Sequence, residues 1–210
     1  MTLGDRMSSP PGQQPNSAIR VCPLPSSERS DEQRVLLERT FGEKAPNLFS
    51  TIVRHPKLFE AWIPFCLHLL ESSVFSLRER ELIILRTAWR CNSPYEWQHH
   101  THIGRRVGIS DTEIRSICSE LDGTWIERER ILLEAADELL ISHGLGDPTW
   151  ARLSDFLSIE QLIELPMLIG HYSLLAGTLN ALAIPRDPAR STDEPFDPWA
   201  KSPQKSLPCE

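Results

Sequence analysis

The sequence lacks the features of several common protein classes. It has no clustered run of lysine and arginine, and its 22 basic residues are outnumbered by 29 acidic ones, which gives a formal net charge of -7. Nucleic-acid binding needs clustered positive charge to displace counterions from phosphates, so nucleic acid is not an expected partner. No apolar run approaches the roughly 20 residues that span a bilayer, so a membrane is not an expected partner either.

The first 20 residues also lack the apolar central segment of a secretory signal. We therefore expect a cytoplasmic protein whose five cysteines are reduced. The cysteines form no C-x-x-C pair and no paired zinc-ligand pattern, and their odd number does not fit a disulfide framework. Their expected role is that of small buried residues or tail residues, with no metal and no cofactor attached.

The distribution of proline indicates where a folded domain begins and ends. Of the 17 prolines, five lie in residues 1–30 and six in residues 185–210. Ends rich in proline and polar residues bury too little apolar surface to offset chain entropy. We expect a flexible N-terminal tail over 1–30, a helical domain over 31–186 and a flexible C-terminal tail over 187–210. Phe196 and Trp199 are the exception, because they could dock on a neighbouring surface.

Between these ends, signals for helix starts recur and signals for strands do not. Asp147 and Pro148 begin one helix, and Gly144 ends the helix before it. The S/T-x-x-E/Q pattern of a capping box occurs at Ser76–Glu79, Ser93–Glu96, Ser110–Glu113, Thr124–Glu127 and Ser158–Gln161.

Earlier helices are expected at about 31–41, 46–54 and 57–72, with Pro64 bending or interrupting the third. No Asn-Gly or Asp-Gly turn separates two alternating apolar runs. The sequence therefore predicts an all-α domain.

Two of these helices carry charged residues where the core-facing stripe should be apolar. Glu81 falls in one such stripe, and Glu96 and His100 stand one turn apart in another. The two stripes are Leu77, Glu81, Leu85 and Ala88, and Glu96, His100, Ile103 and Val107. Burying a charge is costly unless it is paired, and the usual response is a shifted pKa. Three such groups in one dry site would suit proton transfer near neutral pH.

Structural interpretations of the same residues stay open. Glu96 would complete a cap begun by Ser93, His100 would be a hydrogen-bonded core histidine, and Glu81 would be a first-turn residue favoured by the helix dipole. A metal site made from Glu96, His99, His100 and His102 is a weaker alternative. His99 diverges from the Glu96–His100 face, and nothing clearly supplies a third ligand.

The residues from Arg80 to Arg86 (RELIILR), those from Tyr95 to His100 (YEWQHH) and the pair Ile103-Gly104 resemble the carboxymuconolactone decarboxylase family. The superfamily also contains the alkyl hydroperoxidase AhpD proteins. The resemblance is firmest over residues 57–120 and extends more loosely to 170–184. It implies an all-helical AhpD-like fold that assembles as homotrimers or hexamers, with active sites near subunit contacts.

The AhpD branch of the family carries a C-x-x-C-x-x-x-H motif with a glutamate twelve residues before its first cysteine. The glutamate of that motif corresponds to Glu81 and its histidine to His100, whereas its two cysteines correspond to Ser93 and Glu96. The redox pair of a thiol peroxidase is therefore absent, and Cys91 alone cannot replace it.

The decarboxylase branch also lacks the cysteines, and its named reaction is the cofactor-free loss of CO₂ from an unsaturated lactone carboxylate. The resemblance implies a small-molecule substrate and a lyase or isomerase activity in the catabolism of aromatic compounds. His100 would carry the proton, Glu96 would orient or tune the His100 side chain, and Glu81 would be a second acid/base or a polarising partner. Arg86 and Ser93 are the expected substrate-binding residues, with a surface ion pair as the alternative for Arg86.

Two other functions remain as alternatives. One is an AhpD-like antioxidant thiol enzyme, and the other is a non-catalytic oligomeric protein that binds a ligand. His171 and Tyr172 form a second candidate site, although their expected role is that of core or interface residues.

Overall fold

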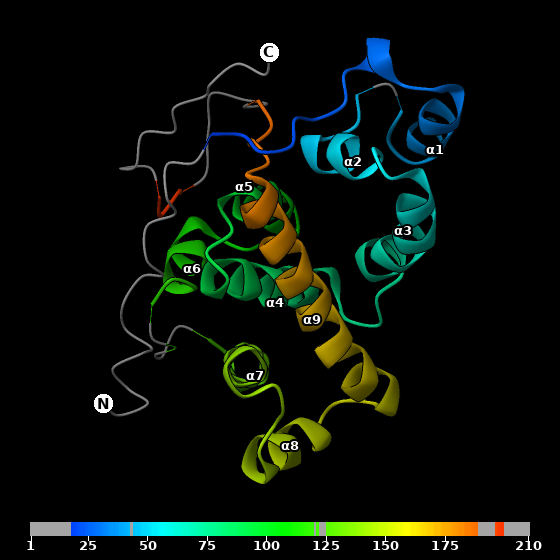
Figure 1. Ribbon diagram of the computed structural model, residues 1–210. Helices are drawn as coiled ribbons and strands as arrows, with labels where there is room; N and C mark the ends of the chain where they lie inside the picture. Colours follow the sequence, from blue (N-terminus) through cyan, green and yellow to red (C-terminus); the bar gives the residue numbers. More distant parts are fainter. Residues whose placement is uncertain (1–17, 43, 120, 122–124, 189–195, 200–210) are drawn as a thin grey trace.

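The computed structural model describes residues 18–42, 44–119, 121, 125–188 and 196–199. Within these residues it contains helices and no strand, which confirms the predicted all-α class (Figure 1). A short 3₁₀ segment, η2, covers Ser26–Glu28. The α-helices are α1 (Asp31–Phe41), α2 (Asn47–Ile52), α3 (Pro56–Glu71), α4 (Leu77–Arg90), α5 (Pro94–Arg106), α6 (Asp111–Ser116), α7 (Glu127–Ser142), α8 (Asp147–Ser154) and α9 (Ile159–Leu182).

Helix α4 is the centre of the fold. It packs against α5, α7 and the long α9, whereas α1, α2 and α3 form a separate layer at one side (Figure 1). Every residue of α4 from Arg80 to Trp89 is buried, so this helix has no solvent-facing side over most of its length. The charged residues among them need partners within the protein.

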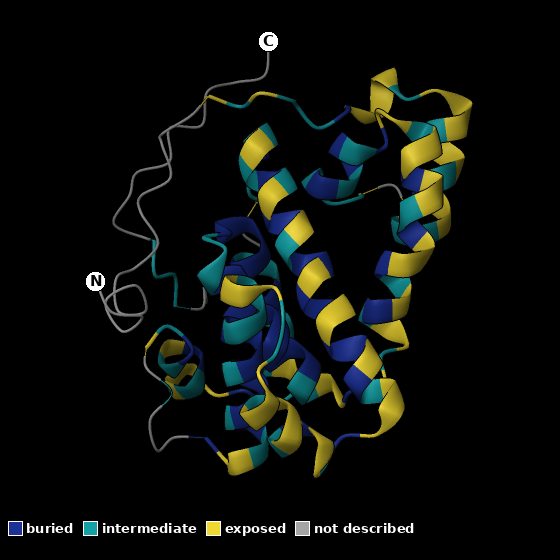
Figure 2. Cartoon of the chain, turned by 60° about the horizontal axis from the view of Figure 1, so that its bottom comes forward, coloured by how far each residue is buried: buried dark blue, intermediate teal, exposed yellow. Residues whose placement is uncertain are grey.

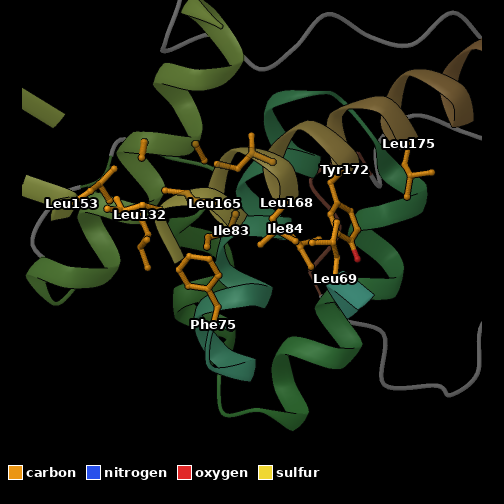
Figure 3. Close-up of a cluster of buried hydrophobic side chains, with 14 of the residues drawn as sticks. Leu69, Phe75, Ile83, Ile84, Leu132, Leu153, Leu165, Leu168, Tyr172 and Leu175 are labelled. Atoms are coloured by element: carbon orange, nitrogen blue, oxygen red, sulfur yellow. The ribbon is translucent and has the colours of Figure 1, made fainter. Parts of the chain in front are cut away.

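The largest apolar core lies between α4, α7 and α9. Ile83 and Ile84 of α4 meet Leu132 of α7 and Leu168 of α9, and all four are fully buried. Figure 3 shows Tyr172 of α9 at one end of this cluster, with its ring among leucine side chains. The core therefore fixes α9 against α4 and sets the position of Tyr172.

Most of the predicted helix starts are confirmed, with one informative exception. Capping boxes form at Ser76, Ser110 and Ser158, and an unpredicted one forms at Ser30. Thr124 lies outside the described residues. Ser93 precedes α5, but its side chain makes no capping hydrogen bond, so the predicted box with Glu96 is wrong.

The helix boundaries follow the sequence closely in the first third of the chain. The predicted ranges 31–41, 46–54 and 57–72 correspond to α1, α2 and α3. Helix α3 continues through Pro64 without interruption. At the end of α7, the left-handed residue is His143, with φ 55° and ψ 27°, and not the predicted Gly144.

The packed unit is larger than residues 31–186. The backbone N–H groups of Arg20 and Val21 both donate to the Leu182 carbonyl, at 3.1 and 3.2 Å, and Leu24 is buried. At the other end, Trp97 Nε1 donates to the Phe196 carbonyl at 2.8 Å. The expected docking of Phe196 is thus confirmed, on this chain itself. Residues 1–17, 189–195 and 200–210 of the predicted tails lie outside the described residues.

The expectation that all five cysteines are reduced is wrong. Cys22 forms a disulfide, whereas Cys66, Cys91 and Cys118 are free. Burial raises the pKa of the Cys66 and Cys118 thiols to about 12. Neither of these two thiols is a thiolate at neutral pH.

Helix α9 is long and apolar enough to cross a membrane by length and composition, so the expectation that no segment reaches that length is wrong. Its most apolar window has a mean hydropathy of 1.3, and 56% of that window is buried within the fold. A buried core helix passes the same test. The long helix in Figure 2 has buried residues on one side and exposed residues on the other.

Candidate active site

Glu81 of α4 and His100 of α5 form a buried hydrogen-bonded pair. The His100 Nδ1 atom lies 2.7 Å from Glu81 Oε2, and both residues are buried. The capping box at Ser76 sets the start of α4, and α5 packs against α4. The predicted stripes therefore do bring these two residues together.

Arg80 fixes the other side of Glu81. Its Nε and Nη2 atoms donate to Glu81 Oε1 at 2.9 and 2.8 Å, and its Nη1 donates to the Leu70 carbonyl. Burial would raise the pKa of Glu81, but His100 and Arg80 together hold it below its ordinary value. Glu81 is therefore a carboxylate that accepts the His100 Nδ1–H, which leaves His100 Nε2 as the reactive nitrogen.

Arg80 did not enter the candidate site from the sequence. Its position directly before Glu81 gives no helical-face signal, since neighbours in sequence point about 100° apart on a helix. The one available signal was that the residues three or four positions from Arg80 on the helix, Leu77, Ile83 and Ile84, are apolar. The structure shows that this arginine is nearly as buried as the glutamate that it binds.

Glu96 is buried without a partner. Neither of its carboxyl oxygens has a hydrogen-bond partner among the described residues. Burial raises the pKa of Glu96 to about 8, with a smaller opposing effect from the nearby Ser93 hydroxyl. Glu96 is thus a neutral carboxylic acid at pH 7, and the carboxyl group that bonds His100 is that of Glu81.

The raised pKa of Glu96 predicts a pH-dependent stability difference between the wild type and Glu96→Gln. Between pH 4.5 and about 8 the folded protein holds a proton on Glu96 that the unfolded chain releases, so raising the pH destabilises the wild type. The variant has no such proton. We expect its stability relative to the wild type to grow by about 3–5 kcal/mol over this interval and then level off.

Urea unfolding of both proteins at several pH values measures this difference. Glu32→Gln, at an exposed position on α1, is the matched control and should show no such growth. A stability difference between wild type and Glu96→Gln that stays constant from pH 5 to pH 8 would contradict a buried neutral Glu96.

Ser93 lies beside Glu96 with its hydroxyl free for another partner. The Ser93 side chain is fully buried, and its Oγ atom has no hydrogen-bond partner among the described residues. Cys91 is close by, with its Sγ atom 3.6 Å from Ser173 Oγ. Burial raises the pKa of the Cys91 thiol, the Ser173 contact lowers it, and Glu96 raises it.

Tyr172 of α9 closes the site from the other half of the fold. Its ring stands edge-on to the His100 ring, with centroids 5.0 Å apart and planes at 88°. Burial raises the pKa of Tyr172 well above its ordinary value, and Glu81 and Glu96 are among the groups that add to this effect. Glu96 lies one helical turn before His100 on α5, and Glu81 bonds His100, so the three predicted residues lie on neighbouring parts of α4 and α5.

Arg86 lies apart from this group. Its Nε and Nη2 atoms donate to the two carboxylate oxygens of Asp137 on α7, at 2.8 and 2.6 Å, and its Nη1 donates to the carbonyls of Ile117 and Ser119. The expected ion pair is present, but it is buried and not on the surface. With its donors engaged in this way, Arg86 joins α4 to α7 and is not part of the site that we describe.

The other histidines of α5 do not add a metal site. His99 points away from His100, as expected, and its Nε2 lies 2.7 Å from Asp187 Oδ2. The same Asp187 oxygen accepts from the Tyr95 hydroxyl at 2.6 Å. In the part of the chain that the structure describes, no group of three or more His, Cys, Asp or Glu side chains is arranged to hold a metal ion.

The segment that carries these residues has known relatives. The model of the carboxymuconolactone decarboxylase family matches residues 56–137, which include Arg80, Glu81, Glu96 and His100. That segment belongs to the carboxymuconolactone decarboxylase family. Among the curated proteins, no sequence matches this chain.

Solved structures show that the AhpD-like fold extends beyond the carboxymuconolactone decarboxylase segment. An alkylhydroperoxidase AhpD core protein, an uncharacterised peroxidase-related protein from Ralstonia eutropha JMP134, is 17% identical over 80% of this chain and 93% of its own, with a TM-score of 0.67. An uncharacterised peroxidase-related protein from Silicibacter sp. TM1040 is 15% identical over 86% and 95%, with a TM-score of 0.65.

The debrominase Bmp8 is 19% identical over 80% of this chain and 91% of its own, with a TM-score of 0.64. A cysteine-to-alanine variant of that debrominase has been solved with 2,3,4-tribromopyrrole. These likenesses establish an AhpD-like helical fold, and they include proteins of more than one activity.

Proposed function

We propose that this protein is a cofactor-independent lyase or isomerase that moves a proton on an enolisable carbonyl compound or a lactone carboxylate. The observation that carries the proposal is the pairing of a charged Glu81–His100 hydrogen bond with a neutral, unpartnered Glu96 in the same buried region. Two titratable groups whose environments push their pKa values apart provide an acid and a base at one pH.

His100, Glu81 and Glu96 have different roles in this reaction. His100 Nε2 removes a proton from the carbon next to the carbonyl, or returns one to it, while Glu81 holds His100 Nδ1–H and stabilises the imidazolium. Glu96, as a neutral acid, donates a hydrogen bond to the oxygen that becomes an enolate. In a decarboxylation, the electrons of the broken C–CO₂ bond enter the same enolate, and carbon then takes a proton from His100 Nε2, which has received that proton from water.

The experiment is to incubate the purified protein with carboxymuconolactone and follow CO₂ release. In parallel, deuterium incorporation from D₂O into a cyclic ketone, β-tetralone, is followed by NMR. We expect at least one reaction to be faster with the wild type than in buffer, and His100→Ala to abolish that increase. Rates equal to those in buffer for both compounds would contradict the proposal.

The debrominase and peroxidase-related neighbours favour thiol chemistry as a second candidate. Against it, the two motif cysteines are replaced by Ser93 and Glu96, and burial raises the pKa of Cys91, the nearby thiol. A Cys91→Ser variant that lost all activity would support a thiol mechanism, whereas one that kept its activity would exclude Cys91 as the nucleophile.

We also propose that the protein self-associates through the exposed face of α9, as the trimeric or hexameric family assembly implies. Ile163, Met167 and Leu174 are 63%, 50% and 60% exposed on this face, and the spacing of four and seven residues keeps them aligned. An exposed apolar stripe on a long helix is typical of an interface between copies.

Leu174→Glu tests this association. We expect the wild type to sediment as a trimer or hexamer and the variant as a smaller species, because a carboxylate in an apolar interface is costly to bury. Leu58→Glu, at a similarly exposed leucine of α3, is the control and should leave the mass unchanged. A monomeric wild type would contradict the proposal.

A further inference from the structure

Two buried nitrogen atoms outside the Glu81–His100 pair have no partner. The indole Nε1 of Trp62 on α3 and the Nε2 of His171 on α9 are both buried and make no hydrogen bond with the described residues. An unpaired buried donor or acceptor is costly, and native proteins contain few of them. These two atoms come from different layers of the fold and meet in one cluster of rings.

The cluster presents flat aromatic surfaces. The Trp62 and His171 rings are nearly parallel, with planes at 22° and centroids 6.1 Å apart. The Phe65 ring stands edge-on to His171, at 88° and 5.2 Å. Because Phe65 is 37% exposed while it touches His171, the cluster reaches the surface at this side chain.

Tyr172 connects this cluster to the catalytic histidine. Its ring is perpendicular to His171, with centroids 5.5 Å apart, and perpendicular to His100, with centroids 5.0 Å apart. The rings of Trp62, His171, Tyr172 and His100 thus follow one another in a continuous series of contacts.

The cluster offers hydrogen bonds without charge. Burial lowers the pKa of His171 to about 4, so its imidazole is neutral at pH 7 and one ring nitrogen carries hydrogen. Arg80 is engaged with Glu81 and Leu70, and Arg86 with Asp137 and two carbonyls. A carboxylate placed against this cluster would lose its hydration without gaining a counter-ion from these arginines.

We propose that Trp62 and His171 bind the ring of an uncharged, planar cyclic carbonyl compound, an unsaturated lactone or a cyclic ketone, whose reacting carbon lies at His100. The Trp62 N–H donates to an oxygen of that ring, and His171 supplies the second hydrogen bond. This specificity rests on the proposed proton-transfer function and narrows it, since it favours neutral rings over the lactone carboxylate of the family's named reaction.

The test compares two matched probes with the full-length protein. Coumarin is a neutral planar lactone, and coumarin-3-carboxylate is the same ring system with a negative charge. Calorimetric titration at pH 7.5 should give coumarin a dissociation constant at least about 10-fold lower than that of the carboxylate. Trp62→Phe and His171→Phe should each raise the coumarin dissociation constant about 5- to 10-fold, the loss of one buried hydrogen bond.

Trp150→Phe is the matched control, because Trp150 lies half-exposed on α8, and its substitution should leave coumarin binding unchanged. Both test variants keep an aromatic ring and remove an unpaired polar atom, so their melting temperatures should stay the same or rise. Equal affinity for the two probes, no binding of coumarin, unchanged affinity in both variants, or a marked fall in both melting temperatures would each overturn the proposal.

The outcome is separable from that of the proposed function. Coumarin binding is measured by calorimetry and needs no proton transfer, so it is read independently of catalysis. Variant-sensitive coumarin binding without catalysis would contradict the proton-transfer function alone. Catalysis with coumarin affinity unchanged in Trp62→Phe and His171→Phe would contradict the ring site alone.

Discussion

His100→Gln is expected to lower the turnover of the proton-transfer reaction by about 10²- to 10⁴-fold, the usual contribution of one general acid/base. The substrate dissociation constant should change little, because the imidazole acts on the reacting carbon and glutamine keeps a similar size. Turnover is measured by CO₂ release or by deuterium incorporation, whichever the wild type accelerates.

His99→Gln is the matched control for His100→Gln. His99 is the neighbouring residue on α5 and bonds Asp187 on the other side of the helix. We expect the His99 variant to keep its turnover. Equal losses in the two variants would show that the effect comes from damage to α5 and not from a proton-transferring His100.

The Glu81→Gln variant tests whether the carboxylate of Glu81 is needed to hold His100 in its reactive tautomer. The glutamine amide can donate to His100 Nδ1, which favours the tautomer with hydrogen on Nε2 and removes the base. It also leaves Arg80 with a neutral partner where the wild type has a carboxylate. We expect turnover to fall strongly while the fold, followed by circular dichroism, is retained. A variant with unchanged turnover would contradict the role of Glu81.

Asp137→Ala is expected to lower the free energy of unfolding by about 3–5 kcal/mol, the cost of leaving a buried charge without its partner. Asp137 accepts both Nε and Nη2 of Arg86, and it also accepts from Arg90. The Arg86 side chain is only 2% exposed, so water cannot replace the lost carboxylate. Urea unfolding at pH 7 measures the loss.

Two further proteins test the assignment of this loss to the buried Arg86–Asp137 pair. The double variant Arg86→Met with Asp137→Leu removes both charges and should recover much of the stability, because apolar side chains of similar size can replace a buried ion pair. Arg34→Ala breaks the exposed pair with Asp31 and should cost less than about 1 kcal/mol. Similar losses for Arg34→Ala and Asp137→Ala would contradict the importance of burial.

The sequence alone determined the class of the fold, and it singled out three candidate site residues. The capping boxes at Ser76 and Ser158 and the apolar periodicity are local signals, so they predict helices without knowledge of their partners. Glu81 and His100 were found because a charged residue in an apolar stripe is visible at helical spacing. A charged residue in an apolar stripe can be recognised from the sequence of a single helix, without knowing what packs against it.

The pairings within the site were decided by tertiary structure. The resemblance implied that Glu96 orients His100, but the packing of α4 against α5 places the carboxylate of Glu81 against His100 Nδ1. The same packing buries Arg80 with Glu81 and leaves Glu96 neutral and without a partner. Arg86 was assigned to substrate from its nearness in sequence, whereas α7 supplies Asp137 and makes it a cross-link.

The contact between side chains of α3 and α9 could not be predicted from the sequence. Tyr172 and His171 lie far along the chain from His100, and the Trp62 ring meets them only because α3 packs across from α9. A hydrophobic pattern tells which face of a helix is buried and not what covers it, because apolar burial is non-directional. The sequence thus determined which side chains turn inward, and the assembled helices decided which of them meet.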